Sequence, residues 1–158
     1  MGKFNNKISA EFHPPRKWIL ERLLSYKNDD IDNEAFHAIG LGGKENEIRC
    51  TKGFETDLAS VPRAIWWLIA PWDIARAAII HDLLYKQIRL YRGKNRGLGH
   101  IDWDKVVAAK KAADKVFLMA MKDAEPSVPS WKIYAAYYAV VLFGRWSIIP
   151  REEDKNAS

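Results

Sequence analysis

Three polar residues suited to acid–base chemistry lie on or beside apolar helix faces. His81 and Asp82 are adjacent in 74–90, which is apolar over most of its circumference, and Asp114 lies on the edge of a second apolar stripe, beside Phe117. A histidine whose ring is held by a carboxylate can take a proton from water. The set therefore predicts a hydrolase site in which His81 is the general base and Asp114 orients it.

Three further residues extend this candidate site, and Asp82 has a second possible role in it. Tyr85 follows His81 by one helical turn and is included with the catalytic residues. Asp82 and Asp57 are candidate ligands of a divalent cation, because oxygen ligands suit calcium, magnesium or manganese. Ser60, in the same turn as Asp57, is a candidate for contact with substrate. Asp57 fits a structural turn residue equally well.

A role without catalysis fits the same residues. A buried histidine needs hydrogen-bond partners, and a network of His81, Asp114 and Tyr85 can specify how a core packs. The two interpretations differ in whether His81 opens into a pocket. A closed histidine argues against an enzyme.

Two groups of residues suit a charged surface. Trp66, Trp67 and Trp72 cluster before the His-Asp segment, and Lys86 and Arg89 begin a basic run that contains no acidic residue. They predict contact with an anionic membrane surface or another phosphate-bearing ligand. The alternatives are core packing for the tryptophans and a solvated helix end for the cations.

The elements that must position these residues follow from hydrophobic periodicity. The spacing predicts helices at about 74–90 and 102–122, the second capped by Asp102. Antiparallel packing of these two helices would bring Asp114 to His81.

The rest of the chain completes an α+β fold. A third helix is predicted, with Ser130 as its N-cap and Gly144 as its end. Residues 35–41 and 47–51 are predicted to form a hairpin, and 17–26 fits a strand or a helix. We therefore predict a small N-terminal β-hairpin or sheet followed by three main helices around a central His-Asp helix.

Composition and the positions of proline and charged residues indicate how the chain is divided into a domain and its ends. The 158 residues, 48% of them hydrophobic with a formal net charge of +5, suit one domain at 17–146. Residues 1–16 are expected to form an extended arm and 147–158 a charged tail, in which 151–158 is expected to be disordered. The single cysteine excludes a disulfide framework and a multi-cysteine zinc site. Neither a signal peptide nor a transmembrane run is expected.

Four motifs occur in a fixed order along the chain. They are Gly53-Phe54 with Thr56-Asp57-x-Ala59-Ser60-Val61-Pro62-Arg63; Ala77-Ala78-x-x-His81-Asp82-x-x-Tyr85; Ala113-Asp114-x-x-Phe117 with Met121; and the spacing of Tyr137, Val141 and Gly144. Over roughly residues 17 to 146 this pattern resembles an uncharacterised family of short phage and prophage proteins, Domain of Unknown Function 1353. The resemblance implies a phage origin, a fold of a hairpin and helices with a strand at 17–26, and no established activity.

The motif His81-Asp82-x-x-Tyr85 also looks like the His-Asp-x-x-Tyr motif of phospholipases A2. In those enzymes the histidine activates water, the next aspartate binds calcium, and a distant aspartate on an antiparallel helix orients the histidine. The resemblance implies these roles for His81, Asp82 and Asp114, with calcium as the cation. The sequence departs from that family in its lack of disulfides and in the position of its only glycine-rich match, residues 40–43, far from His81.

A weaker similarity is to metal-dependent phosphohydrolases. His37, the His81-Asp82 pair and Asp114 reproduce the order of their ligands. Those enzymes carry the first histidine on a helix, whereas His37 lies in a segment predicted to be a strand.

Two functional hypotheses result. The first is a small phage-encoded hydrolase, with lipid ester hydrolysis as its most concrete form. The second is a non-catalytic virion, assembly or host-interaction protein whose His and Asp residues form a structural polar core. In both cases we expect a phage or host component as partner and a location in the host cytoplasm or the virion.

Overall fold

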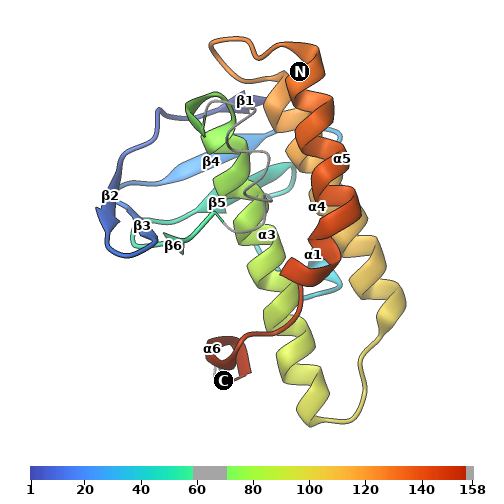
Figure 1. The fold of residues 1–158 in the computed structure, drawn as a ribbon. Helices are drawn as coiled ribbons and strands as arrows, with labels where there is room; N and C mark the ends of the chain where they lie inside the picture. The colour runs from blue at the N-terminus through green and yellow to red at the C-terminus, as the bar shows by residue number, and fades with distance from the viewer. Residues whose placement is uncertain (59–70, 156–158) are drawn as a thin grey trace.

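The fold combines two small antiparallel sheets with long helices, as the α+β prediction stated (Figure 1). The structure is a computed structural model, and it describes residues 1–58 and 71–155. The sheets lie to one side of the long helix α3 (Pro71–Gly97), and α4 (Trp103–Lys122) and α5 (Ser130–Ser147) lie to the other. In this arrangement α3 is the central helix of the domain.

The first sheet has β4 in its centre. Its strands are β1 (Lys3–Phe4), β4 (Leu24–Lys27) and β5 (Glu47–Cys50), in the order β1-β4-β5. Tyr26 pairs with Ile48, and both are buried against the helices. Strand β4 is buried along most of its length, which fits its central position.

The second sheet is a hairpin with one added strand. Its strands are β2 (Ala10–His13), β3 (Lys17–Leu20) and β6 (Glu55–Thr56), in the order β2-β3-β6. Residues 1–16 therefore contribute a strand to each sheet. Strand β6 carries Thr56 to the edge of α3, which matters for the site described below.

The predicted hairpin of 35–41 with 47–51 is wrong. Residues 33–37 form a short helix, α1 (Asn33–His37), and β5 pairs with β4 instead. The side chain of Asp32 caps α1 by accepting a hydrogen bond from the Ala35 N–H at 3.0 Å. Ala35, Phe36 and Ile39 then bury one helical face. The cap and this helical spacing override the strand pattern.

The central helix α3 is longer than the predicted 74–90. Pro71 stands at its first helical position, where the missing N–H of proline costs nothing. The helix also continues past the predicted end at residue 90 to Gly97. Basic residues in the last turn, Lys94 and Arg96, suit the negative end of the helix dipole.

Helix α4 agrees with the prediction, whereas α5 differs from it at both ends. Asp102 caps α4 by accepting from the Lys105 N–H at 3.3 Å. The N-cap of α5 is Pro129 instead of Ser130, and the helix runs past Gly144 to Ser147. Gly144 does not end the helix: its lack of a side chain makes room for the Tyr85 hydroxyl, which an added Cβ would overlap.

The end of the chain packs against α3, which corrects the expectation of a disordered tail for residues 151–155. A short helix, α6 (Glu152–Lys155), lies beside α3 (Figure 1). Asp154 is buried there and pairs with Arg89 of α3 at 3.0 Å. Within residues 1–58 and 71–155, no helix is long and apolar enough to cross a membrane.

Candidate functional site

The predicted meeting of His81 and Asp114 is present. The short connection between α3 and α4 makes the two helices antiparallel, so the middle of one faces the middle of the other (Figure 1). His81 Nε2 lies 3.0 Å from Asp114 Oδ1. Because a carboxylate only accepts hydrogen bonds, Nε2 carries the proton and donates it.

Two more donors hold the Asp114 carboxylate. The Tyr85 hydroxyl donates to Oδ1 at 2.6 Å, and Lys110 Nζ donates to Oδ2 at 2.7 Å. Lys110 lies one helical turn before Asp114 on α4, where such pairs meet. Each carboxylate oxygen therefore has at least one partner, and the network joins both helices.

These contacts set the charge of the group we call the Asp114 cluster, formed by His81, Tyr85, Lys110 and Asp114. Burial by itself would raise the pKa of Asp114, but the hydrogen bonds from His81, Lys110 and Tyr85 outweigh it and lower that pKa. Burial and the neighbouring carboxylate raise the pKa of Tyr85, so its hydroxyl stays a donor. The cluster contains a stable carboxylate surrounded by donors.

The His81 ring is closed in. Its exposed fraction is 0%, and the rings of Tyr85 and Phe117 lie 4.0 and 4.9 Å from it, centre to centre. His81 does not line any of three pockets that described residues bound. The other ring nitrogen, Nδ1, has no hydrogen-bond partner among the described residues, which is uncommon for a buried polar atom.

Asp82 belongs to a different environment, although it is the next residue. One step along a helix turns a side chain by about 100°, so Asp82 faces β6 instead of α4. The Thr56 hydroxyl donates to Asp82 Oδ2 at 2.5 Å, and Oδ1 has no partner within the described part of the chain. Burial, against the effect of the Thr56 hydrogen bond, raises the pKa of Asp82, and the charge of Asp57 adds to the rise.

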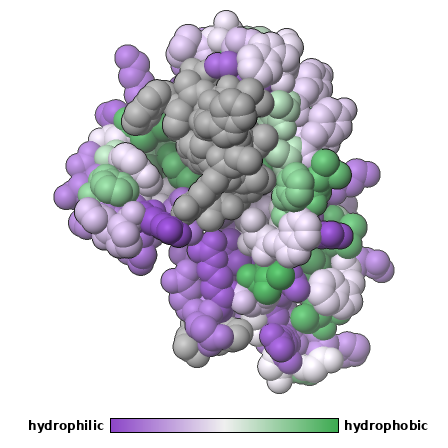
Figure 2. Space-filling view, viewed as in Figure 1, coloured by the Kyte–Doolittle hydropathy of each residue, from purple (hydrophilic) through white to green (hydrophobic). Residues whose placement is uncertain are grey.

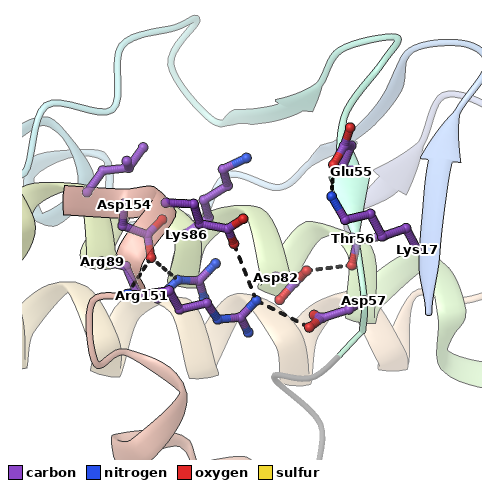
Figure 3. A pocket seen from close by; sticks show the side chains of 11 residues that line it. Lys17, Glu55, Thr56, Asp57, Asp82, Lys86, Arg89, Arg151 and Asp154 are labelled. Atoms are coloured by element: carbon purple, nitrogen blue, oxygen red, sulfur yellow. Dashed lines mark hydrogen bonds and ion pairs between the residues drawn. The ribbon is translucent and has the colours of Figure 1, made fainter. Parts of the chain in front are cut away.

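Asp82 lines an open, charged pocket between β6, α3 and α6 (Figure 3). Its volume is about 220 Å³. The residues that line it are Lys17, Glu55, Thr56, Asp57, Asp82, Lys86, Arg89, Leu90, Arg151, Glu153 and Asp154. We call this site the Asp82 pocket.

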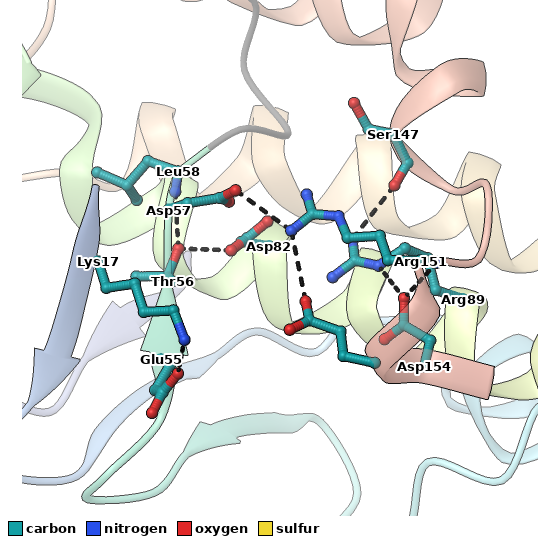
Figure 4. A network of polar contacts seen from close by, with 11 residues as sticks. Lys17, Glu55, Thr56, Asp57, Leu58, Asp82, Arg89, Ser147, Arg151 and Asp154 are labelled. Atoms are coloured by element: carbon teal, nitrogen blue, oxygen red, sulfur yellow. Dashed lines mark hydrogen bonds and ion pairs between the residues drawn. The ribbon is translucent and has the colours of Figure 1, made fainter. Parts of the chain in front are cut away.

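Ion pairs occupy most of the charges in the Asp82 pocket (Figure 4). Arg151 reaches Asp57 at 3.2 Å, and Lys17 reaches Glu55 at 2.9 Å. Arg89 pairs with Asp154 and also donates to the Ser147 carbonyl at 3.2 Å. Arg89 is therefore buried and engaged by the end of the chain, and it does not present its charge to an outside surface.

The predicted site residues thus fall into two groups. His81, Tyr85 and Asp114 lie together in the Asp114 cluster. Asp82 and Asp57 line the Asp82 pocket, and so do the predicted cations Lys86 and Arg89. Ser60, Trp66 and Trp67 lie outside the described residues, and Trp72 is described only as part of the α3 backbone.

Four contributing residues are absent from the sequence-based site. Lys110 had a local signal, since it precedes Asp114 by one turn on an apolar face. Thr56, Arg151 and Asp154 had none, because their partners are 26 or more positions away. His37, the first ligand of the phosphohydrolase pattern, lines a separate pocket with Gln87 and Tyr91.

The described oxygen atoms do not form a calcium site. Calcium takes six to eight oxygen ligands. Asp82 Oδ1 lacks a partner in the described ranges. However, Asp57 forms an ion pair with Arg151, and the Thr56 hydroxyl donates a hydrogen bond to Asp82. Among the described residues, no group of three or more His, Cys, Asp or Glu side chains could hold a metal ion.

Comparison with known proteins identifies the family. The model of the family described as "Protein of unknown function (DUF1353)" matches residues 36–140, well over half of the chain. Searches of curated proteins and of solved structures found no match. The matched range contains the Asp114 cluster and most of the Asp82 pocket, and the chain belongs to the DUF1353 family of proteins of unknown function.

Proposed function

We propose that this chain is a non-catalytic binding protein, in which the Asp114 cluster is a structural polar core. The observation that carries the proposal is the complete burial of the His81 ring between α3 and α4. A general base must contact the water or substrate from which it takes a proton. A ring with no exposed surface, packed against Tyr85 and Phe117, is suited to holding helices together.

The hydrogen bonds of the Asp114 cluster support this role. Asp114 receives hydrogen bonds from His81 and Tyr85 on α3 and from Lys110 on its own helix. The Tyr85 hydroxyl also lies against Gly144 of α5. One carboxylate thereby connects side chains that position all three long helices, and buried networks of this kind specify a single packing arrangement.

The proposed role is that of a virion or assembly component, or of a protein that binds a host component. The resemblance to short phage and prophage proteins supports this setting. On this proposal the cluster fixes the shape of the domain, and the outer surface makes the functional contacts.

Two substitutions of His81 test the proposal. His81→Gln keeps an amide N–H that can donate to Asp114 but removes the titratable ring, whereas His81→Ala removes the donor as well. A structural role predicts that the free energy of unfolding falls more for Ala than for Gln. It also predicts that wild type and both variants release fatty acid from phospholipid vesicles only at the background rate, with calcium or with a chelator.

A hydrolase is the second candidate, and a specific observation favours it. His81 Nδ1 is buried without a partner among the described residues while Nε2 is fixed by Asp114, which is the arrangement of a histidine prepared to accept a proton. If the chain is a hydrolase, Nδ1 takes a proton from water and Asp114 stabilises the resulting imidazolium. Hydrolysis by wild type that is lost in a folded His81→Gln variant would establish this candidate and overturn the structural role.

A further inference from the structure

The outer face of α5 is covered by large nonpolar side chains that no described residue buries. Trp131, Tyr138, Leu142 and Trp146 have exposed fractions of 52 to 62%, and Tyr134 has 42%. They recur every three or four positions from one end of the helix to the other, so they form one stripe. We call these five residues the α5 stripe, and Figure 2 shows some hydrophobic residues among paler ones where Figure 1 places α5.

The charged side chains of α5 itself are all basic. The helix from Ser130 to Ser147 contains no aspartate or glutamate. Lys132 lies over the Trp131 ring at 5.9 Å and Arg145 over the Trp146 ring at 4.3 Å. Lys122, from the end of α4, lies over the Tyr134 ring at 5.2 Å. Cations therefore stand beside the aromatic rings at both ends of the stripe.

We propose that the α5 stripe is a docking surface for an anionic lipid bilayer. This inference deepens the proposed binding role, on which it rests, by naming the partner. Tryptophan and tyrosine suit the boundary between headgroups and acyl chains, because each has an apolar body and a polar tip. Lysine and arginine beside them meet the negative headgroups, as in amphipathic helices that lie in the plane of a membrane.

Charge complementarity distinguishes this partner from a second copy of the chain. In a symmetric dimer across α5, the stripe of one copy would face that of the other. Lys122, Lys132 and Arg145 would then approach their counterparts with no carboxylate on the helix to offset them. An anionic bilayer instead presents negative headgroups to the cations at both ends of the stripe.

The test measures binding of the full chain to phospholipid vesicles by sedimentation and by tryptophan fluorescence. Vesicles of phosphatidylcholine with about 30% phosphatidylglycerol are compared with vesicles of phosphatidylcholine alone, because the anionic lipid supplies the negative surface potential that attracts basic side chains. We expect binding to the anionic vesicles to be about tenfold or more tighter, and to weaken as salt is raised.

Three variants keep the result interpretable. Trp131→Ser/Tyr138→Ser/Leu142→Ser removes stripe residues that are already exposed, so folding is retained, and Lys122→Glu/Lys132→Glu/Arg145→Glu reverses the charges. Each is expected to weaken binding by about tenfold or more. The matched control, Phe12→Ser/Leu98→Ser, changes exposed nonpolar residues away from α5 and is expected to bind as wild type does.

Several outcomes would overturn the inference. They are background binding by wild type, equal loss in the control variant, or a dimer in analytical ultracentrifugation that the stripe substitutions dissociate. A protein partner with an acidic surface that competes the chain off vesicles at the stripe would also replace the bilayer as occupant. Fatty acid release in the same vesicles is scored separately: His81-dependent release overturns the non-catalytic role but leaves membrane binding intact.

Discussion

Asp114 and Asp82 are two buried aspartates on either side of the same stretch of α3, and their surroundings move their pKa values in opposite directions. Asp114 is reached by three donors, one of them the ammonium of Lys110, and its pKa is lowered. Asp82 is reached, within the described residues, by the Thr56 hydroxyl alone, and its pKa is raised. Burial raises the pKa of both groups, and the number and charge of the donors decide whether that rise is overcome.

The comparison assigns different roles to neighbouring positions. Both oxygens of Asp114 have hydrogen-bond donors, and no member of the Asp114 cluster lines the Asp82 pocket or the pocket beside His37. Asp82 is a carboxylate in the wall of an open pocket, with one oxygen unsatisfied by the described residues. A histidine and an aspartate that are adjacent in sequence thus belong to separate regions, because one helical step turns them apart.

The largest expected effect is the loss of Asp114. Asp114→Ala leaves the buried donors of His81 and Tyr85 unpaired and removes the partner of Lys110. Breaking a buried charge network costs about 3–5 kcal/mol, so we expect a loss of that size in the free energy of unfolding. Urea unfolding at pH 7 measures it, and a loss under about 1 kcal/mol would show that the cluster is not structural.

Tyr85→Phe is expected to have a smaller effect. The substitution removes one hydrogen bond to a charged acceptor and keeps the ring that packs on His81. Such a bond contributes about 1.5–3 kcal/mol, and the two remaining donors keep Asp114 satisfied. The same unfolding experiment measures the effect, and Tyr91→Phe, which leaves the Asp114 cluster unchanged, serves as the control. An equal loss of unfolding free energy in Tyr85→Phe and Tyr91→Phe would show that the Tyr85 hydroxyl does not stabilise the cluster.

The pH dependence of stability should distinguish the two carboxyl groups. Asp114 binds its proton less readily in the folded state, so its contribution is present above the unfolded pKa of about 3.9 and is lost as pH falls through the folded value. Asp82 behaves in the opposite way: its contribution is present below about 3.9 and is lost as pH rises through its raised pKa.

Unfolding measured from about pH 2.5 to 7 in wild type, Asp114→Asn and Asp82→Asn separates these contributions. Asp114→Asn should flatten the loss of stability at acid pH, because the group that protonates is gone. Asp82→Asn should remove the decline in the free energy of unfolding that Asp82 causes as pH rises above its unfolded pKa. A tenfold difference in proton affinity between the folded and unfolded states corresponds to about 1.4 kcal/mol of stability. Identical curves for the two variants would contradict the assigned directions.

The Asp114 cluster was accessible from the sequence because its determinants are local. Hydrophobic periodicity placed His81 on the inner face of one helix and Asp114 on the edge of the apolar stripe of another, and a short connection forces those helices to run antiparallel. The cap at Asp102 marked the start of α4 correctly. Lys110 was also within reach, as a cation one turn from an inward-facing acid.

The Asp82 pocket was not accessible, because it is built from distant segments. Thr56 arrives on β6, whose partner strand β3 lies far back in the chain, and Asp154 reaches Arg89 across 65 positions. Neither pairing leaves a periodic signal in the sequence. The prediction for the segment around α1 was wrong for another reason. Five residues are too few for periodicity to distinguish a helix from a strand, and the Asp32 cap favours the helix.

The smallest expected effect is that of Asp82→Asn at pH 7, and it sharpens the comparison most. Asparagine keeps an oxygen that can accept from the Thr56 hydroxyl and removes a charge that burial disfavours. We expect the free energy of unfolding to change by less than about 1 kcal/mol, or to rise, since loss of a buried charge offsets any poorer hydrogen bond. Urea unfolding beside Asp114→Asn measures the contrast between two chemically identical substitutions. A loss at Asp82 as large as that at Asp114 would mean that Asp82 is held as an anion by a bound cation, and the loss would then depend on added calcium or chelator.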